Sequence, residues 1–336
     1  MNPSPFSEFV AANLTDLENV AVAVRALGMD AVLKSKSGHV GLPLGGAEMG
    51  TLLYFAAMNY APQNPHWIDR DRFVLSAGHG SMLQYALLHL AGFALPLQEI
   101  ENFRQWGSLT PGHPEYGHTE GVEVTTGPLG QGIANGVGMA LAEALLAARF
   151  SSGSAPVVDH KTYVILGDGC MMEGVSSEAC SLAGHLKLSK LVAFYDANNI
   201  TIDGTIDIAF TETVKARFAA YGWNVLDADG NSFASLATAL DAAHANSQKP
   251  IGTASPTLVV CKGIAGKGSP KWEGKPKVHG NPMSAEDVVD AKKHLGIENT
   301  TPFTVPQKCL DSLSQNSRRT ECPMAVFALF PEFKGL

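Results

Sequence analysis

Cysteine is scarce in this chain, and its distribution argues against a disulfide framework. The 336 residues include five cysteines, at positions 170, 180, 261, 309 and 322, and no C-x-x-C motif. An odd, scattered set fits a reducing compartment better than a stapled secreted domain. The first residues, MNPSPFSEFV, lack a basic segment followed by an apolar core. We therefore expect no signal peptide and a cytoplasmic protein.

Basic charge is also scarce. Lys and Arg number 24 against 32 Asp and Glu, which gives a formal net charge of -8. Because a nucleic-acid-binding domain carries a basic patch, we expect no nucleic-acid partner. No apolar run reaches the length that a membrane span needs, so we expect no membrane association. The hydrophobic content of 45% is ample for a packed globular core.

Helix-like and strand-like patterns alternate along most of the chain. The apolar periodicity predicts helices over 14–36, 133–150, 174–188 and 284–295. Short apolar runs predict strands over 73–75, 163–166, 191–195 and 257–261. This order is typical of an α/β fold with a doubly wound, mainly parallel sheet and helices on both faces. We expect one domain over 1–300 and a divergent tail of unknown role over 301–336.

Two long stretches have little periodicity. Residues 104–128 are rich in Gly, Pro, His and Thr, and residues 262–283 are rich in Gly and Lys. Structureless segments of this length inside a compact domain are usually functional. We expect both near the carboxyl edge of the sheet. Lys262 and Lys267 could neutralise phosphate there, but solvated loop charges are the favoured interpretation.

Polar turns follow two neighbouring strands of the predicted sheet. Gly167-Asp168-Gly169 follows strand 163–166, and Asp196-Ala197-Asn198-Asn199 follows strand 191–195. Ligands bind at this edge of open α/β sheets, glycine admits a close backbone approach, and a following helix favours an anion. Carboxylate, amide and carbonyl oxygens suit a hard divalent cation. The pattern predicts a metal-bridged diphosphate; the alternative is that Asp168 and Asn198 only stabilise turns.

These two blocks resemble the thiamine diphosphate-binding signature, GDG followed at a distance by NN. Further motifs resemble the transketolase family in its own order, over about residues 15–300: SGH at 37–39, SAGHGS at 76–81, PGHPE at 111–115, TTGPLGQG at 125–132, EGVSSEA at 173–179 and DANNITIDG at 196–204. The resemblance implies a thiamine diphosphate-binding fold and two-carbon ketol transfer between sugar phosphates in the pentose phosphate pathway. A related synthase, such as 1-deoxyxylulose-phosphate synthase, is the alternative within the enzymes, and the PGHPE loop and DANNITIDG turn favour transketolase.

The resemblance also implies specific site residues. The metal, Mg²⁺ or Ca²⁺, would be held by the side chains of Asp168 and Asn198 and the backbone carbonyl of Ile200. Asp196 is less certain and could only shape its turn. The cofactor-binding residues would be His79, Gly127, Leu129, Gly167, Asp168, Gly169, Glu173, Asn198 and His279. Glu173 could instead be a helix-dipole carboxylate, although the family places this glutamate in a carboxylate network at a subunit interface.

Four of the 11 histidines lie in glycine-bounded loops: His39, His79, His113 and His279. A single histidine is more often a surface or core residue. By resemblance these four are catalytic, and imidazoles suit proton transfer to and from sugar hydroxyls. Zinc binding is a weaker hypothesis, because no H-x-x-x-H helix or cysteine partner is present.

The resemblance covers only half of a transketolase polypeptide. The pyrimidine-binding domain, which carries the glutamate that activates the cofactor, has no counterpart here. The chain could be one subunit of a split enzyme, a truncated domain, or a non-catalytic cofactor-binding or assembly domain. We expect a pyrimidine-domain partner chain and a homodimer or heteromer. The apolar helices over 133–147 and 174–188 would form the interface, and the isolated chain would be inactive.

Overall fold

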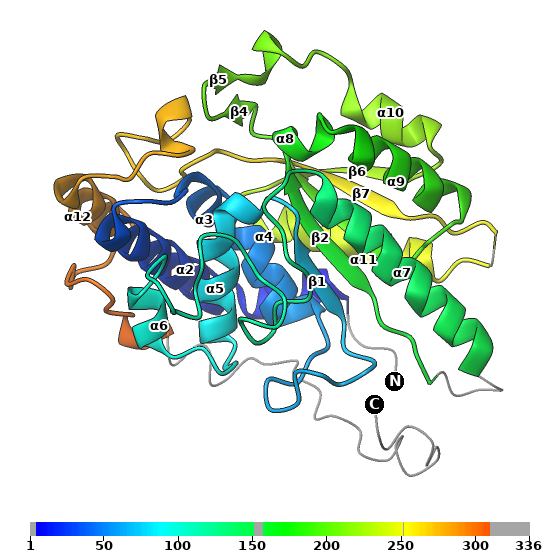
Figure 1. Ribbon diagram of the computed structural model, residues 1–336, viewed down its shortest axis with the longest axis horizontal. Coiled ribbons are helices and arrows are strands. Elements are labelled where there is room, and N and C mark those ends of the chain that lie inside the picture. The colour runs from blue at the N-terminus through cyan, green and yellow to red at the C-terminus, as the bar shows by residue number, and fades with distance from the viewer. Residues whose placement is uncertain (1–4, 151–156, 251, 310–336) are drawn as a thin grey trace.

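Five parallel strands form the central sheet of the protein, in the order β1-β2-β3-β7-β6. The computed structural model describes residues 5–150, 157–250 and 252–309. Helices cover both faces of the sheet (Figure 1), as the sequence predicted. The strands are β1 (Arg72–Leu75), β2 (Thr162–Gly167), β3 (Leu191–Asp196), β6 (Asn224–Asp229) and β7 (Thr257–Lys262).

Alternating side chains divide the interior into two cores. In β1, Phe73 and Leu75 join one hydrophobic cluster and Val74 joins the other. In β2, Tyr163 lies in the first cluster and Val164 in the second. Successive strand residues point to opposite faces, so these continuous apolar strands need helices on both sides. This is the physical origin of the doubly wound architecture.

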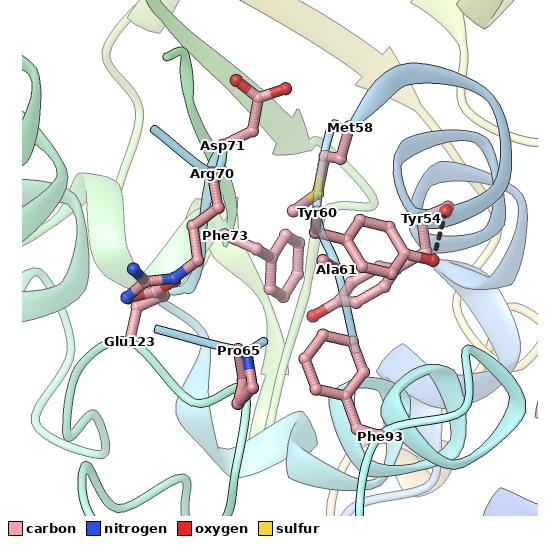
Figure 2. Close-up of a pocket in the computed structure, with 11 residues that line it drawn as sticks. Tyr54, Met58, Tyr60, Ala61, Pro65, Arg70, Asp71, Phe73, Phe93 and Glu123 are labelled. Carbon is pink, nitrogen blue, oxygen red and sulfur yellow. Dashed lines mark hydrogen bonds and ion pairs between the residues drawn. The ribbon is translucent and has the colours of Figure 1, made fainter. Parts of the chain in front are cut away.

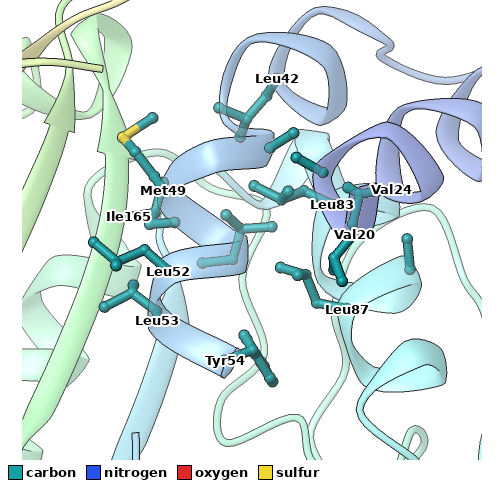
Figure 3. Close-up of a cluster of buried hydrophobic side chains, with 14 of the residues drawn as sticks. Val20, Val24, Leu42, Met49, Leu52, Leu53, Tyr54, Leu83, Leu87 and Ile165 are labelled. Atoms are coloured by element: carbon teal, nitrogen blue, oxygen red, sulfur yellow. The ribbon is translucent and has the colours of Figure 1, made fainter. Parts of the chain in front are cut away.

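The larger core lies between one face of the sheet and a thick layer of helices. Figure 3 shows α4 lying between Ile165 of the sheet and Val24 of α2. The elements of this face are α1 (Phe6–Ala12), α2 (Leu14–Ser35), α3 (Gly41–Gly45), α4 (Ala47–Leu52), the π-helical turn η1 (Leu53–Ala57), α5 (Ser81–Leu90), α6 (Leu97–Glu101), α11 (Phe233–Ser247) and α12 (Ala285–His294).

The helix predicted over 14–36 is α2, but it is not amphipathic as expected. Almost every residue from Val20 to Val32 is buried, including Arg25 and Asp30. The reason is tertiary, because α3, α4, α5, α6 and α12 all pack around it. Its predicted apolar stripe is therefore only part of its buried surface.

The second core is smaller and lies on the opposite face. Its helices are α7 (Gln131–Phe150), α8 (Asp168–Met171), α9 (Gly174–His185) and α10 (Val214–Ala220). Figure 1 shows α7 and α9 side by side, outside β2 and away from the larger core. Both were predicted as helices, although α9 ends before the expected residue 188.

Helix α7 differs from the expectation that no apolar segment reaches the length of a membrane span. Among the described residues it is the one helix long and apolar enough to cross a membrane, with a mean hydropathy of 1.3 and only 28% of the tested window buried. A single helix of this kind is weak evidence for a membrane span, because helices packed in proteins pass the same test. Its charged Glu143 is buried and pairs with Lys190 at 2.6 Å. On its outer face, α7 exposes the apolar side chain of Leu145.

The two aperiodic stretches contain almost no regular structure, as predicted. Residues 104–128 hold neither helix nor strand, and residues 263–283 hold only the 3-10 turn η4 (Pro276–Val278). Four short elements complete the described fold: η2 (Gly78–Gly80), the hairpin strands β4 (Ile200–Thr201) and β5 (Gly204–Thr205), and η3 (Ile206–Ile208). The hairpin follows β3 directly, at the same end of the sheet as α8.

Candidate functional site

One cavity of about 600 Å³ lies at the carboxyl edge of the sheet. The ends of β2 and β3, the loop 104–128 and the segment 262–283 all contribute to its wall. Every residue that the sequence singled out for the site lines it: His39, His79, His113, Gly127, Leu129, Gly167, Asp168, Gly169, Glu173, Asn198, Ile200 and His279. The structure thus brings together residues spread over 240 positions of the chain.

Asp168 is the carboxylate at the floor of this cavity. It is 3% exposed, its Oδ1 accepts a hydrogen bond from the Tyr195 hydroxyl at 2.5 Å, and its Oδ2 accepts one from the Asn199 N–H at 3.0 Å. Burial raises the pKa of Asp168, and these hydrogen bonds oppose the rise. All of these donors are neutral, and no Lys, Arg or His of the described residues forms an ion pair with it. A buried carboxylate without a cation is costly, so the site fits a bound cation.

The turn after β3 fixes the Asn198 amide. Its Nδ2 donates to Asp196 Oδ2 at 2.8 Å, and its Oδ1 accepts from the Ile200 N–H at 2.9 Å. Asn199 between them has a φ of 61°, the left-handed conformation that asparagine tolerates. Asp196 is buried, which raises its pKa to about 7; the Asn198 amide lowers this pKa and nearby Asp168 raises it. Asp196 therefore orients Asn198, a role beyond shaping the turn.

A metal at this site would need non-protein ligands. The described part of the chain has no group of three or more His, Cys, Asp and Glu side chains arranged to hold a metal ion. Asp168, Asn198 and the Ile200 carbonyl provide at most three oxygens, and Mg²⁺ requires an octahedral set. An anionic ligand in the cavity would complete it. The turn-only interpretation explains the contact between Asn198 and the Ile200 N–H, but not the unpaired charge of Asp168.

The glycines of the motifs keep the cavity open. A Cβ at Gly167 would meet no atom within 4 Å, so that position faces free space in the cavity wall. A Cβ at Gly169 would lie 2.8 Å from the Leu129 side chain. Gly127 has a φ of 152°, and its Cβ would lie 3.3 Å from the His113 ring. These close approaches seat loop 104–128 and the segment after it against α8.

The first motif itself forms the single helical turn α8. Helix α9 begins at Gly174, as predicted, with Glu173 exposed at its N-cap position. Arg217 of α10 joins the two helices, because its Nη2 donates to the Met171 carbonyl at 2.8 Å and its Nη1 to Ser177 Oγ at 3.0 Å. The sequence offered no motif for this link.

Three histidines form a compact cluster in the cavity wall. The ring centroids of His39 and His79 lie 4.9 Å apart, those of His79 and His279 4.9 Å, and those of His39 and His279 5.7 Å. Burial lowers the pKa of His39 to about 4 and that of His79 to about 3, and the neighbouring histidines add to both shifts. Burial also lowers the pKa of His279. All three rings are therefore neutral at pH 7, and the buried Nδ1 of His39 has no partner among the described residues.

His113 reaches the cavity from the loop 104–128. Burial lowers its pKa, and the nearby guanidinium of Arg104 lowers it further. Arg104 also depresses the pKa of His39, and its Nη1 donates to Ser37 Oγ at 2.8 Å. Arg104 was not among the predicted site residues, and it does not line the cavity itself. The one sequence signal was its place at the start of the aperiodic stretch.

The hairpin after β3 adds an apolar rim that the sequence analysis also missed. Ile202, Ile206 and Ile208 line the cavity, and Ile208 is 75% exposed. Ile202 belongs to the motif 196–204, which was interpreted only as a turn, and Ile206 and Ile208 follow that motif in the turn η3. Exposed isoleucines beside a polar cavity are typical of a surface that a ligand or partner covers.

The lysines of segment 262–283 behave differently from one another. Lys262 is exposed, as expected. Lys267 is not a solvated charge, because its ammonium pairs with Glu48 Oε1 at 2.9 Å and donates to the Asn231 carbonyl at 3.0 Å. The expectation of a solvated loop charge was therefore wrong for Lys267. The alternative, neutralisation of a phosphate, does not describe its contacts either.

A second, enclosed cavity lies beside β1 and is far smaller, at about 10 Å³. Figure 2 shows its wall of aromatic rings, including Phe73 and Phe93, beside Arg70 and Glu123. Arg70 donates to both oxygens of Glu123, at 2.7 and 2.6 Å. The space admits about one water molecule, so this cavity is not a ligand site.

Comparisons with known proteins agree with this geometry. The family model described as "Transketolase, thiamine diphosphate binding domain" matches residues 17–326. Transketolase 1 of Escherichia coli strain K12 is 52% identical over 296 residues, which are 88% of this chain and 44% of that protein. The transketolase of Nostoc sp. is 53% identical over 306 residues, 90% of this chain and 45% of that protein.

Solved structures show the same correspondence. The transketolase of Leishmania mexicana superposes with a TM-score of 0.87 at 44% identity, over 94% of this chain and 48% of that one. A Pichia stipitis transketolase described as a complex with sedoheptulose 7-phosphate superposes with a TM-score of 0.86 at 42% identity, over 94% and 47%. The chain spans less than half the length of the relatives it matches.

Proposed function

Because the chain belongs to the transketolase family, by its thiamine diphosphate-binding domain, we propose that it supplies the diphosphate and metal half of a transketolase active site. The reaction is two-carbon ketol transfer between sugar phosphates, a step of the pentose phosphate pathway. The observation that carries the proposal is the buried Asp168, which lines the same cavity as every predicted site residue and forms no ion pair with a Lys, Arg or His of the described residues. The domain would extend over 1–300, with 301–336 as its tail.

The cavity residues fit thiamine diphosphate and a divalent cation. Asp168, Asn198 and the Ile200 carbonyl would hold Mg²⁺ or Ca²⁺, and Gly167 and Gly169 would admit the diphosphate. The backbone at Gly127 and Leu129 would face the aminopyrimidine amine. When bound, the cofactor supplies a carbon nucleophile and a sink for carbanion charge.

The histidines would serve the sugar rather than the metal. Neutral imidazoles at pH 7 accept a hydrogen bond at one ring nitrogen and donate one at the other. His39, His79 and His279 would therefore lie near the diphosphate and the reacting oxygens and move the protons of the reacting hydroxyls. His79 and His279 would also contact the cofactor, and His113 would contact the donor's hydroxyls. Partial burial in the cavity wall lowers their pKa values and keeps the rings uncharged at pH 7.

The proposal requires a partner. A transketolase needs a pyrimidine-binding half, and this chain spans less than half of its relatives. The outer face of α7 and α9 supports a homodimer or heteromer, because Leu145 is 62% and Leu182 47% exposed there. In the family Glu173, at the N-terminus of α9, belongs to a carboxylate network at a subunit interface. Trp106 is 104% exposed in loop 104–128 and is a further contact for a partner.

The thiols of Cys170, Cys180, Cys261 and Cys309 are buried and form no disulfide, which supports a cytoplasmic location.

The test is an assay with and without the second half. The chain is mixed with thiamine diphosphate, Mg²⁺, xylulose 5-phosphate and ribose 5-phosphate, alone and with a separately produced pyrimidine-domain half. We expect no turnover alone and clear turnover in the mixture. Turnover by the chain alone would contradict the missing-half account. No turnover in either case, without cofactor binding, would favour a non-catalytic assembly domain.

A further inference from the structure

The segment 262–283 carries His279 and rests directly on α3 and α4. A Cβ at Gly41 would lie 3.1 Å from the Val278 carbonyl oxygen, and one at Gly45 would lie 2.9 Å from the Ile264 carbonyl oxygen. The Gly266 N–H donates to the Gly41 carbonyl at 3.3 Å. We call this region, where Gly41 and Gly45 contact the backbone of Val278 and Ile264, the seat of the segment. It is made of close backbone contacts and involves few side chains.

A charged network locks this seat from the side. The Glu48 carboxylate of α4 receives two cations, Arg25 of α2 at 2.6 Å and Lys267 of the segment at 2.9 Å. Only 6% of the Glu48 side chain is exposed, and 4% of that of Arg25. Charge-assisted hydrogen bonds of this kind are shorter and stronger than neutral ones. Lys267 is the one member that belongs to the segment.

Asn231, in the turn after β6, also connects α3 to the segment through hydrogen bonds. Its Nδ2 donates to the Gly45 carbonyl at 3.0 Å, and its Oδ1 accepts from the Ile264 N–H at 2.9 Å. Its own carbonyl accepts from Lys267 Nζ at 3.0 Å. Helix α4, the β6–α11 turn and the segment therefore meet at one polar node.

The node is linked to His279 through the interior of the segment. The Gly274 N–H donates to the Ala265 carbonyl at 2.9 Å, and a Cβ at Gly266 would lie 2.6 Å from the Val278 side chain. Val278 is fully buried and directly precedes His279. The residues around Lys267 thus support the turn that sets the His279 ring on His79.

We propose that Lys267 is a positioning residue that holds His279 in the histidine cluster. It acts through Glu48 and Asn231 and touches no reacting group. The network stands independently of the reaction, and only the catalytic consequence rests on the proposed function. A phosphate-binding role for Lys267 conflicts with its contacts, because its ammonium is already held by a carboxylate and a carbonyl.

The test follows the His279 ring directly, without cofactor or substrate. The full chain with labelled histidine is titrated by NMR, and the His279 signal is assigned by its loss in His279→Asn. In the wild type, burial holds the pKa of His279 below its usual value. In Lys267→Met we expect the His279 midpoint to rise by about 0.5 or more towards about 6.5, because the ring gains water.

Three further variants separate position from charge and from folding. Lys262→Met removes the same charge from an exposed lysine of the segment and is expected to leave the His279 midpoint unchanged. Asn231→Ala changes no charge and should raise the midpoint as Lys267→Met does, which also covers a Lys267→Met chain that fails to fold. Lys267→Arg keeps the cation and should restore most of the wild-type midpoint.

The inference is overturned if Lys267→Met and Asn231→Ala leave the His279 midpoint where it is. It is also overturned if the midpoint of His160, which is buried outside the cavity, rises equally, because that would report general loosening. Neither result depends on activity, so a failure of the proposed function would be seen separately, in the two-half assay.

Discussion

At the scale of single residues, the site is defined by ionisable side chains that have no oppositely charged partner among the described residues. Asp168 accepts hydrogen bonds from neutral donors, and no carboxylate contributes to the lowered pKa values of the half-buried His39, His79 and His279. A stable core does not require either arrangement, since buried ionisable groups are costly. The proposed divalent cation would compensate the charge of Asp168, and a ligand in the cavity would provide hydrogen-bond partners for the histidine rings.

Replacing Asp168 tests this directly. Asp168→Asn keeps the shape of the side chain but removes the charge, so we expect thiamine diphosphate affinity in the presence of Mg²⁺ to fall at least about tenfold, or about 1.4 kcal/mol. Isothermal titration of the chain mixed with its pyrimidine-domain half provides the measurement. Asp290→Asn, on the exposed side of α12, is the matched control. Equal thiamine diphosphate affinity in Asp168→Asn and Asp290→Asn would contradict the proposal that Asp168 binds a metal.

The histidine cluster predicts how stability depends on pH. The folded-state pKa values of His39 and His79 are about 4 and about 3, below the unfolded value of about 6.5. Between these values the unfolded chain binds more protons, so stability is full above pH about 6.5 and is lost as the pH falls towards 4 and 3. Each histidine adds a slope of at most about 1.4 kcal/mol per pH unit. Urea unfolding of His79→Asn from pH 7 to 5 should show a shallower loss than the wild type; parallel curves would contradict the cluster's neutrality.

At the scale of elements, close backbone contacts decide how the helices sit. A Cβ at Gly184 of α9 would lie 1.9 Å from the Tyr221 carbonyl oxygen, just after α10. A Cβ at Gly138 of α7 would meet nothing within 4 Å. Two helical glycines of one sheet face therefore serve different purposes, and the sequence alone does not distinguish them.

These two glycines make a matched pair of predictions. Gly184→Ala should destabilise the chain by about 1–3 kcal/mol, because backbone must move to admit the methyl group. Gly138→Ala should stabilise it by about 0.5–1 kcal/mol, because alanine is the better helix former. Thermal unfolding of dilute protein measures both. Similar midpoints for the two variants would show that the α9–α10 contact is looser than described.

At the scale of the whole molecule, the two faces of the sheet differ in how well they are covered. The face carrying α2, α4, α5 and α11 is covered by several layers of helix (Figure 1). On the other face, Leu145 of α7 is 62% and Leu182 of α9 47% exposed. Such an apolar surface on a helix with little burial is typical of an interface. We expect the proposed pyrimidine-domain partner to cover this surface.

A charge placed on this surface should prevent association. We expect Leu182→Glu, on α9, to shift the chain towards monomer by at least about tenfold in dissociation constant, because burying an unpaired carboxylate is unfavourable. Leu14→Glu, at the exposed start of α2, is the control. Sedimentation at several concentrations measures both. Identical sedimentation of wild type and Leu182→Glu would indicate that α7 and α9 are not the interface.

Much of the fold was predictable because its signals are local. Short apolar runs predicted β1, β2, β3 and β7, since fully buried parallel strands need apolar residues on both sides. The edge strand β6 was not predicted, because its sequence NVLDAD is half polar and only half buried. The hairpin β4–β5 was missed for a similar reason, since each strand has two residues.

The sequence predicted residues that the structure places around one cavity, but it did not predict their contacts. Glycines and polar residues directly after apolar strands specify the carboxyl edge of a parallel sheet, wherever the chain goes next. Asp168 and Asn198 were therefore found from local order alone. Tyr195, Arg104, Arg217 and Lys267 were not, because each acts across a distance that only packing closes. The tertiary structure alone decided that His39, His79 and His279 would meet in one cluster with lowered pKa values, since burial is a property of the assembled layers.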